Sequence, residues 1–111
     1  MADDTVMTVL MTAPDRETGR RVAARLVEER LAACGNVLEG VTSVFWWEGA
    51  VQDEPEVLVI LKTTRAHADR LTERIRELHP YDVPEVLALP VERGLQEYMD
   101  WVRDETGPTE A

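Results

Sequence analysis

Residues 57–61 of the chain, VLVIL, are five apolar residues in succession. Their β-branched members favour a strand, in which successive side chains point to opposite faces. A strand of this composition therefore needs apolar cover on both faces of its sheet. Full burial of one such side chain contributes about 1.5–3 kcal/mol, so a second face left in water would forgo several kcal/mol. Any fold of this chain has to cover both sides of this strand.

The same run lies in the second arm of an expected long β-hairpin over residues 41–64, VTSVFWWEGAVQDEPEVLVILKTT. Residues 41–47 are rich in the β-branched and aromatic side chains typical of strands. Gly49 can adopt positive φ, which favours a reversal at residues 48–50 over one at 53–55. Pro55 then has to occupy an edge or a bulge, because it has no N–H for a neighbouring strand. The hairpin tip is expected to project beyond the compact domain.

The remaining elements follow from hydrophobic periodicity and from residues that start and stop helices. Asp15 can cap a first helix, and Gly35 with Asn36 can stop it, because both residue types tolerate the left-handed conformation. Pro80 stops a second helix, and Pro90 restricts the last strand to a sheet edge or ends it early. We expect, in order, a strand at 5–11, a helix from 14 or 15 to about 33, the start of a strand at 37–38, the hairpin, a helix at 64–79, a strand at 86–91, a short helix after residue 94 and a disordered tail at 106–111.

This order, β-α-β-β-α-β with a C-terminal helix, predicts an α+β, ferredoxin-like sandwich. We expect the 111 residues to form a single domain with an ordered core at about 5–105. Both connecting helices of such a unit pack on one face of the sheet, which leaves the other face to a ligand, a nucleic acid or another subunit. Here that face is expected to be apolar, which favours subunit association.

Composition limits the partners and the compartment. The net charge of −10 disfavours nucleic acid and anionic membranes. Residues 1–4 are acidic where a secretory signal would be basic, and no apolar run approaches the roughly eighteen residues that span a bilayer. Cys34 is the only cysteine, so an internal disulfide and a structural zinc cage from one chain are excluded. We therefore expect a cytoplasmic protein.

Several motifs resemble the CutA divalent-cation tolerance family, over most of the chain from about residue 6 to residue 101. They are EERLAACGN at 28–36, GVTSVFWWEG at 40–49, ILKT at 60–63, HPYDVPEVLALPVERG at 79–94 and YMDWV at 98–102. The resemblance implies a ferredoxin-like subunit in a tight homotrimer whose long hairpins reach to neighbouring subunits. It links the chain to tolerance of divalent metals, with copper binding in some members. It also implies an assembly similar to PII nitrogen-signalling trimers, which bind small ligands between subunits.

Cys34 and His79 are the candidate metal ligands. A thiolate is a soft ligand suited to copper or zinc, and neutral imidazole is the commonest metal ligand. Each residue also has a structural interpretation, Cys34 as a small buried residue and His79 as a helix-terminal residue favoured by the helix dipole. Gly35 departs from the small or β-branched apolar residue usual in the family and is expected to loosen the backbone beside Cys34. His67, outside any motif, is expected to be solvent-exposed.

A second group of candidates lies in the hairpin and in the loop before the last strand. Lys62 is the only lysine, and its compact ammonium suits an anionic ligand, although pairing with a carboxylate is the alternative. Trp46 and Trp47 point to opposite faces of a strand and are expected to anchor an interface. The residues that could meet in a cleft between subunits are Glu48, Lys62, Tyr81, Asp82 and Glu85.

The sequence contains no Ser-His-Asp-like set, P-loop, HExxH or glycine-rich dinucleotide motif, which favours a non-enzymatic protein. The leading interpretation is a trimeric, cytoplasmic protein of divalent metal-ion response that binds copper or another divalent cation and requires no cofactor. Two alternatives remain open. One is a PII-like sensor that binds a small anionic metabolite between subunits through Lys62 and Tyr81. The other is a structural trimer that presents its hairpin tips to a partner.

Overall fold

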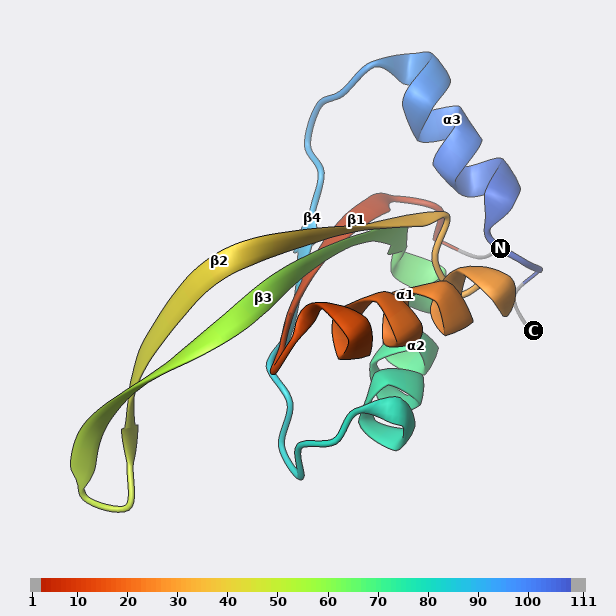
Figure 1. Ribbon diagram of the computed structural model, residues 1–111. Helices are drawn as coiled ribbons and strands as arrows, with labels where there is room; N and C mark the ends of the chain where they lie inside the picture. The colour runs from red at the N-terminus through yellow and green to blue at the C-terminus, as the bar shows by residue number, and fades with distance from the viewer. Residues whose placement is uncertain (1–2, 109–111) are drawn as a thin grey trace.

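A computed structural model of the chain describes residues 3–108. Within that range the elements are β1 (Val6–Ala13), α1 (Arg16–Glu28), β2 (Cys34–Trp47), β3 (Ala50–Thr64), α2 (Arg65–Leu78), β4 (Val86–Pro90) and α3 (Gln96–Glu105). The strands form one antiparallel sheet in the order β2-β3-β1-β4, and α1 and α2 lie on the face opposite to α3 (Figure 1). This confirms the predicted ferredoxin-like fold. None of the described helices has the length and apolar character needed to cross a bilayer.

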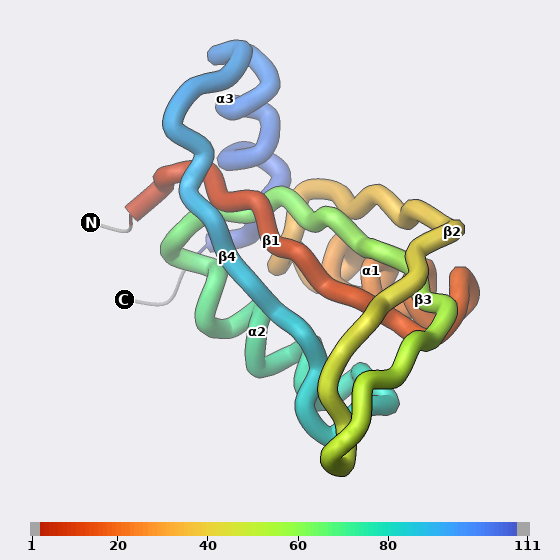
Figure 2. The backbone as a smooth tube through the Cα atoms, turned by 90° about the vertical axis from the view of Figure 1, so that its left-hand side faces the viewer, coloured from red at the N-terminus to blue at the C-terminus, as the bar shows by residue number. Residues whose placement is uncertain are grey.

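The hairpin formed by β2 and β3 reverses at Glu48 and Gly49, as predicted. Both residues have positive φ, 50° and 79°, which suits the central positions of a type I′ turn. β3 pairs with β1 only from Val57 onward, so the outer part of β3, including Pro55, pairs with β2 alone. Pro55 therefore occupies an edge, one of the two predicted positions, and the tip projects from the body of the molecule in Figure 1 and faces the viewer in Figure 2.

The first helix, α1, ends earlier than predicted. It stops at Glu28, and residues 34–36 already belong to β2. Arg30 adopts a left-handed φ of 61°, and the Leu31 N–H donates back to the Leu26 carbonyl at 2.9 Å, as in a Schellman helix end. The prediction placed the stop at Gly35 and Asn36 because those residue types favour this conformation. Here an arginine adopts it instead.

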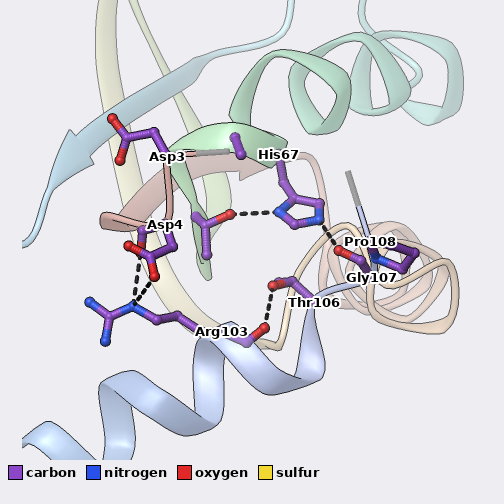
Figure 3. Close-up of a pocket in the computed structure, with 9 residues that line it drawn as sticks. Asp3, Asp4, His67, Arg103, Thr106, Gly107 and Pro108 are labelled. Atoms are coloured by element: carbon purple, nitrogen blue, oxygen red, sulfur yellow. Dashed lines mark hydrogen bonds and ion pairs between the residues drawn. The ribbon is translucent and has the colours of Figure 1, made fainter. Parts of the chain in front are cut away.

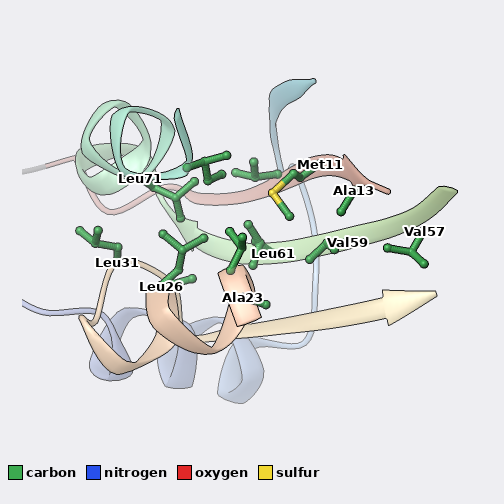
Figure 4. Packing of buried hydrophobic residues seen from close by; sticks show 13 residues of the cluster. Met11, Ala13, Ala23, Leu26, Leu31, Val57, Val59, Leu61 and Leu71 are labelled. Atoms are coloured by element: carbon green, nitrogen blue, oxygen red, sulfur yellow. The ribbon is translucent and has the colours of Figure 1, made fainter. Parts of the chain in front are cut away.

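The main core lies between the sheet and the layer formed by α1 and α2 (Figure 4). Alternate residues of β1 and β3 point into it, as the period of two in a strand requires. Its buried members are Val9, Met11, Ala13, Val22, Ala23, Leu26, Leu31, Ala32, Val57, Val59, Leu61, Leu71 and Ile75. This core covers one of the two faces that the apolar run in β3 requires.

The other face of the sheet is only partly covered within one chain. α3 packs over its edge, where the buried Val102 contacts Val6 and Ala33. The rest of this open face carries large apolar residues from all four strands, some aligned directly across the register: Leu10, Leu38, Leu58, Ile60, Leu87 and Leu89. Leu38, Leu87 and Leu89 are 43%, 55% and 47% exposed. The second face of the apolar run, formed by the half-buried Leu58 and Ile60, is therefore only partly covered.

Two residues just after α3, in the stretch 106–111 where a disordered tail was expected, contact the rest of the chain. Thr106 is buried, and the Gly107 N–H donates to the Arg30 carbonyl at 2.9 Å. No local pattern predicts the contact of Gly107, because its partner Arg30 lies far away in the sequence. Residues 109–111 lie outside the described residues.

His67 is buried, although it was expected to be exposed. Its Nε2 lies 2.5 Å from the Gly107 carbonyl oxygen, and its Nδ1 lies 2.6 Å from the Thr64 hydroxyl oxygen. The position of His67 in the first turn of α2 gave no sign of burial, because the residue that covers it comes from the far end of the chain. A histidine without a motif thus has a structural role.

Candidate functional site

Cys34 begins β2 and lies on the open face, directly opposite Lys62 of β3. Its Sγ shares a hydrogen bond with the Tyr98 hydroxyl of α3, at 3.3 Å. The pKa of Tyr98 is raised to about 12, mainly by this hydrogen bond and secondly by burial. The hydroxyl therefore keeps its proton at neutral pH. Lys62 donates to the side-chain oxygen of Asn36 rather than to a carboxylate. The thiol therefore lies half-buried between the sheet and α3.

His79 follows α2 and is engaged with the backbone through both ring nitrogens. Its Nε2–H donates to the Thr12 carbonyl at 2.8 Å, and its Nδ1 accepts from the Tyr81 backbone N–H at 3.1 Å. The residue is also buried. A metal ion could bind this imidazole only by displacing one of these hydrogen bonds. The geometry therefore favours the structural interpretation of His79, which joins the end of α2 to β1.

Tyr81 ties the loop after α2 to the base of the hairpin. Its hydroxyl donates to Glu56 Oε2 at 2.8 Å, and its ring centroid lies 4.7 Å from that of His79. Burial, followed by the hydrogen bond to Glu56, raises the pKa of Tyr81 to about 12. The hydroxyl therefore remains a donor at neutral pH. Asp82 and Glu85 are exposed in the same loop.

The predicted ligands Cys34 and His79 do not meet within one chain. Cys34 lies opposite Lys62, which lies opposite Thr8, whereas His79 binds the carbonyl of Thr12. Four residues of strand separate these positions by roughly 13 Å. No three His, Cys, Asp or Glu side chains among residues 3–108 are arranged to hold a metal ion.

The predicted cleft group also stays apart within one chain. Glu48 lies in the turn at the hairpin tip, Lys62 near the other end of β3, and Tyr81 in the loop after α2 (Figure 1). Trp46 and Trp47 are 74% and 59% exposed near the tip, on opposite faces of β2 by strand alternation. A set that converges could come only from more than one chain.

Sequence reasoning missed the polar partners of these candidates, Asn36, Glu56 and Tyr98. Asn36 was interpreted as part of a helix stop, which hid its position in β2 two residues after Cys34. Once β2 is extended back to Cys34, strand alternation places Cys34, Asn36 and the facing Lys62 on one side of the sheet. The strand alternation that groups Cys34, Asn36 and Lys62 was therefore present in the sequence. It could be recognised only if α1 was predicted to end before Cys34.

Gly35 is a paired residue of β2, opposite Leu61, and not a loose position beside Cys34. It faces the helical layer, where an added Cβ would lie 2.8 Å from Leu61 Cδ2 and 3.2 Å from Ala23 Cβ. The absence of a side chain lets α1 pack close to the sheet. The expected loosening of the backbone is therefore wrong.

Replacing Gly35 by Val should lower the free energy of unfolding by about 1–3 kcal/mol, because a side chain inserted between Leu61 and Ala23 overpacks the core. Urea denaturation measures the effect. Thr42→Val is the matched control, since it adds a β-branched apolar residue at an exposed position of the same strand. Unchanged or higher stability of the Gly35 variant would show that α1 can move away from β2 without cost.

Together these features describe a class of protein: an α+β sandwich whose sheet presents an uncovered apolar face, bordered by a half-buried thiol and a projecting hairpin. Comparison with known proteins identifies the family. Residues 7–105 match the family described as CutA1 divalent ion tolerance protein. The chain belongs to this family.

Individual relatives agree along nearly the whole chain. A Thermus thermophilus protein named divalent-cation tolerance protein CutA is 50% identical over 99 residues, which cover 89% of this chain and 96% of that protein. The crystal structure of CutA1 from Oryza sativa matches with a TM-score of 0.93 at 42% identity, over 96% of this chain and 98% of that one. A CutA structure from Archaeoglobus fulgidus, called periplasmic, has a TM-score of 0.87 at 36% identity, over 90% and 97% of the two chains.

Proposed function

We propose that this chain acts as a homotrimer in the tolerance of divalent metal ions, in the cytoplasm and without catalysing a reaction. Membership of the CutA1 family supports the role in metal-ion tolerance. The main evidence for association is that six large apolar residues, from four strands, are not fully covered on the open face of the sheet. Burial of each contributes up to about 1.5–3 kcal/mol, and closed homo-oligomers bury such faces. A trimer is the assembly that the sequence resemblance implies.

Binding of copper or another divalent cation requires donors from more than one chain in this proposal. His79 already uses both ring nitrogens, so Cys34 is the soft donor that each chain contributes. Its Sγ lies on the same face of the sheet, at the edge that α3 covers and beside the surface proposed for association. The Tyr98 hydroxyl and the Asn36 side chain are polar groups close to the same face. The bound cation would be the ion to which the protein responds, and no further cofactor is required.

Titration calorimetry with zinc(II), which is redox-inert, and with copper(II) tests this assignment on protein whose mass has first been measured by light scattering. We expect binding that Cys34→Ala weakens at least about tenfold, because the variant removes the thiolate ligand. His79→Ala is the matched control and should bind as the unsubstituted chain does. Equal binding by the Cys34 variant, or loss of binding in a folded His79 variant, would contradict the assignment, and a monomeric mass would contradict the assembly.

A second candidate function is a structural trimer that presents its hairpin tips to a partner protein. The exposure of apolar residues near the tip supports it. Val44, Trp46 and Val51 near the tip are 68%, 74% and 60% exposed. Acrylamide quenching of tryptophan fluorescence in a Trp101→Phe variant reports on the tip alone. Strong quenching in the assembled protein would favour partner presentation, and weak quenching would show that neighbouring subunits bury the tips. The other alternative, a sensor that binds an anionic metabolite through Lys62 and Tyr81, has no such support within one chain. Lys62 lies near the end of β3, whereas Tyr81 lies in the loop after α2.

A further inference from the structure

We propose that residues 106–108 act as a strap that holds α3 closed over the Cys34 thiol, with His67 as the residue that fastens the strap. The inference concerns access to the thiol and does not depend on metal binding. It starts from two findings: His67 is buried by the C-terminal end of the chain, and Tyr98 of α3 contacts Cys34.

His67 joins the start of α2 to the strap (Figure 3). Its ring lies between the Thr64 hydroxyl and the Gly107 carbonyl, with distances of 2.6 Å and 2.5 Å. A carbonyl oxygen only accepts, so Nε2–H donates to Gly107, and Nδ1 of the neutral ring accepts from Thr64. Both nitrogens are thus satisfied in a buried position. Loss of the ring would leave the Gly107 carbonyl of the strap and the buried Thr64 hydroxyl without this partner.

The strap is also fixed to the loop after α1. The Gly107 N–H donates to the Arg30 carbonyl at 2.9 Å, and the Arg30 guanidinium donates to the Glu105 carbonyl at 3.3 Å. An added Cβ at Gly107 would lie 3.2 Å from Arg30 Cβ, so the two segments approach closely. Thr106 is buried beside them. The C-terminal end of α3 is therefore attached to both α2 and the loop that precedes β2.

The remainder of α3 is held less firmly. Val102 is its only fully buried residue, Met99 packs beside it while only partly buried, and Leu95, just before the first turn, is 69% exposed. Burial of one valine supplies about 1.5–3 kcal/mol at most, and Arg103 adds a hydrogen bond to the Asp4 carbonyl at 2.9 Å. A helix with so few buried contacts opens at low free-energy cost unless its end is fixed. The position of α3 over Cys34 therefore depends on the strap.

The rate at which the thiol reacts with the disulfide reagent DTNB tests the proposal, because Cys34 is the only cysteine. The thiolate attacks the reagent disulfide, forms a mixed disulfide and releases one coloured aromatic thiolate. We expect His67→Leu, which keeps bulk but removes both hydrogen bonds, to react about tenfold faster than the unsubstituted chain. Amide hydrogen exchange in α3 should rise together with the rate.

His79→Leu is the matched control, because it also removes a buried histidine that donates to a backbone carbonyl, but at Thr12 and away from α3. Its thiol should react within about twofold of the unsubstituted chain. Unchanged reactivity in His67→Leu, or the same acceleration in both variants, would overturn the proposal. If His67→Leu does not fold, Gly107→Pro removes the N–H that donates to the Arg30 carbonyl and should also accelerate the reaction. An unchanged rate in folded Gly107→Pro would then overturn the proposal.

Discussion

Replacing Ile60 by Asp is expected to convert the proposed trimer into a monomer. Ile60 lies in the middle of the open face, between Leu10 of β1 and Asn36 of β2. Association would enclose the new carboxylate among apolar groups, and an unpaired buried charge costs several kcal/mol in each subunit. Within one chain the position is only half-buried, so the carboxylate can reach water and the fold should survive. The substitution thus separates assembly from folding.

Light scattering measures the result as a fall from three times the chain mass to the 12.6 kDa of one chain. The circular dichroism spectrum should keep its mixed helix and strand character. Val83→Asp is the matched control, because it makes the same change in charge at a loop residue that is 89% exposed. A trimeric Ile60 variant, or dissociation of the Val83 variant as well, would show that the open face does not form the interface.

Much of the fold could be predicted because it follows from local chemistry. The apolar run at 57–61 required a central strand, which the structure confirms. The missing N–H left Pro55 an edge or a bulge and left Pro90 an edge or an early strand end. The structure places both prolines at an edge, with Pro90 also the last residue of β4. The turn at Glu48 and Gly49 followed from the tolerance of glycine for positive φ. In each case the residue itself carries the constraint, so no knowledge of distant contacts was needed.

The candidate site was predicted less well because it depends on register and on remote contacts. Cys34 and His79 belong to motifs, but the pairing of β2 with β3 places the cysteine roughly 13 Å along the sheet from the histidine contact at Thr12. The burial of His67 arises from Gly107, forty residues away in sequence. Neither the β2–β3 register nor the contact between His67 and Gly107 can be recognised from the residues next to them in the sequence.

Leu26→Ala is expected to destabilise the fold by about 2–5 kcal/mol. Leu26 is fully buried in the core between α1 and the sheet. Truncation removes its contacts and leaves a cavity that the surrounding strands and helices can fill only in part. Because single domains are stable by only about 5–15 kcal/mol, this is a large share of the total. The backbone bond from Leu31 to the Leu26 carbonyl should persist, so the loss reports on packing.

Urea denaturation of Leu26→Ala in the Ile60→Asp background measures this loss without a contribution from association, which otherwise makes stability depend on protein concentration. Val27→Ala is the matched control, since it shortens the next residue of the same helix at a position that is 37% exposed. Its cost should stay below about 1 kcal/mol, because much of the side chain is already in water. Equal losses in the two variants would mean that the layer formed by α1 and α2 does not carry the stability of the single chain. A difference of about 2 kcal/mol or more would locate that stability in the covered face of the sheet and leave the open face available for assembly.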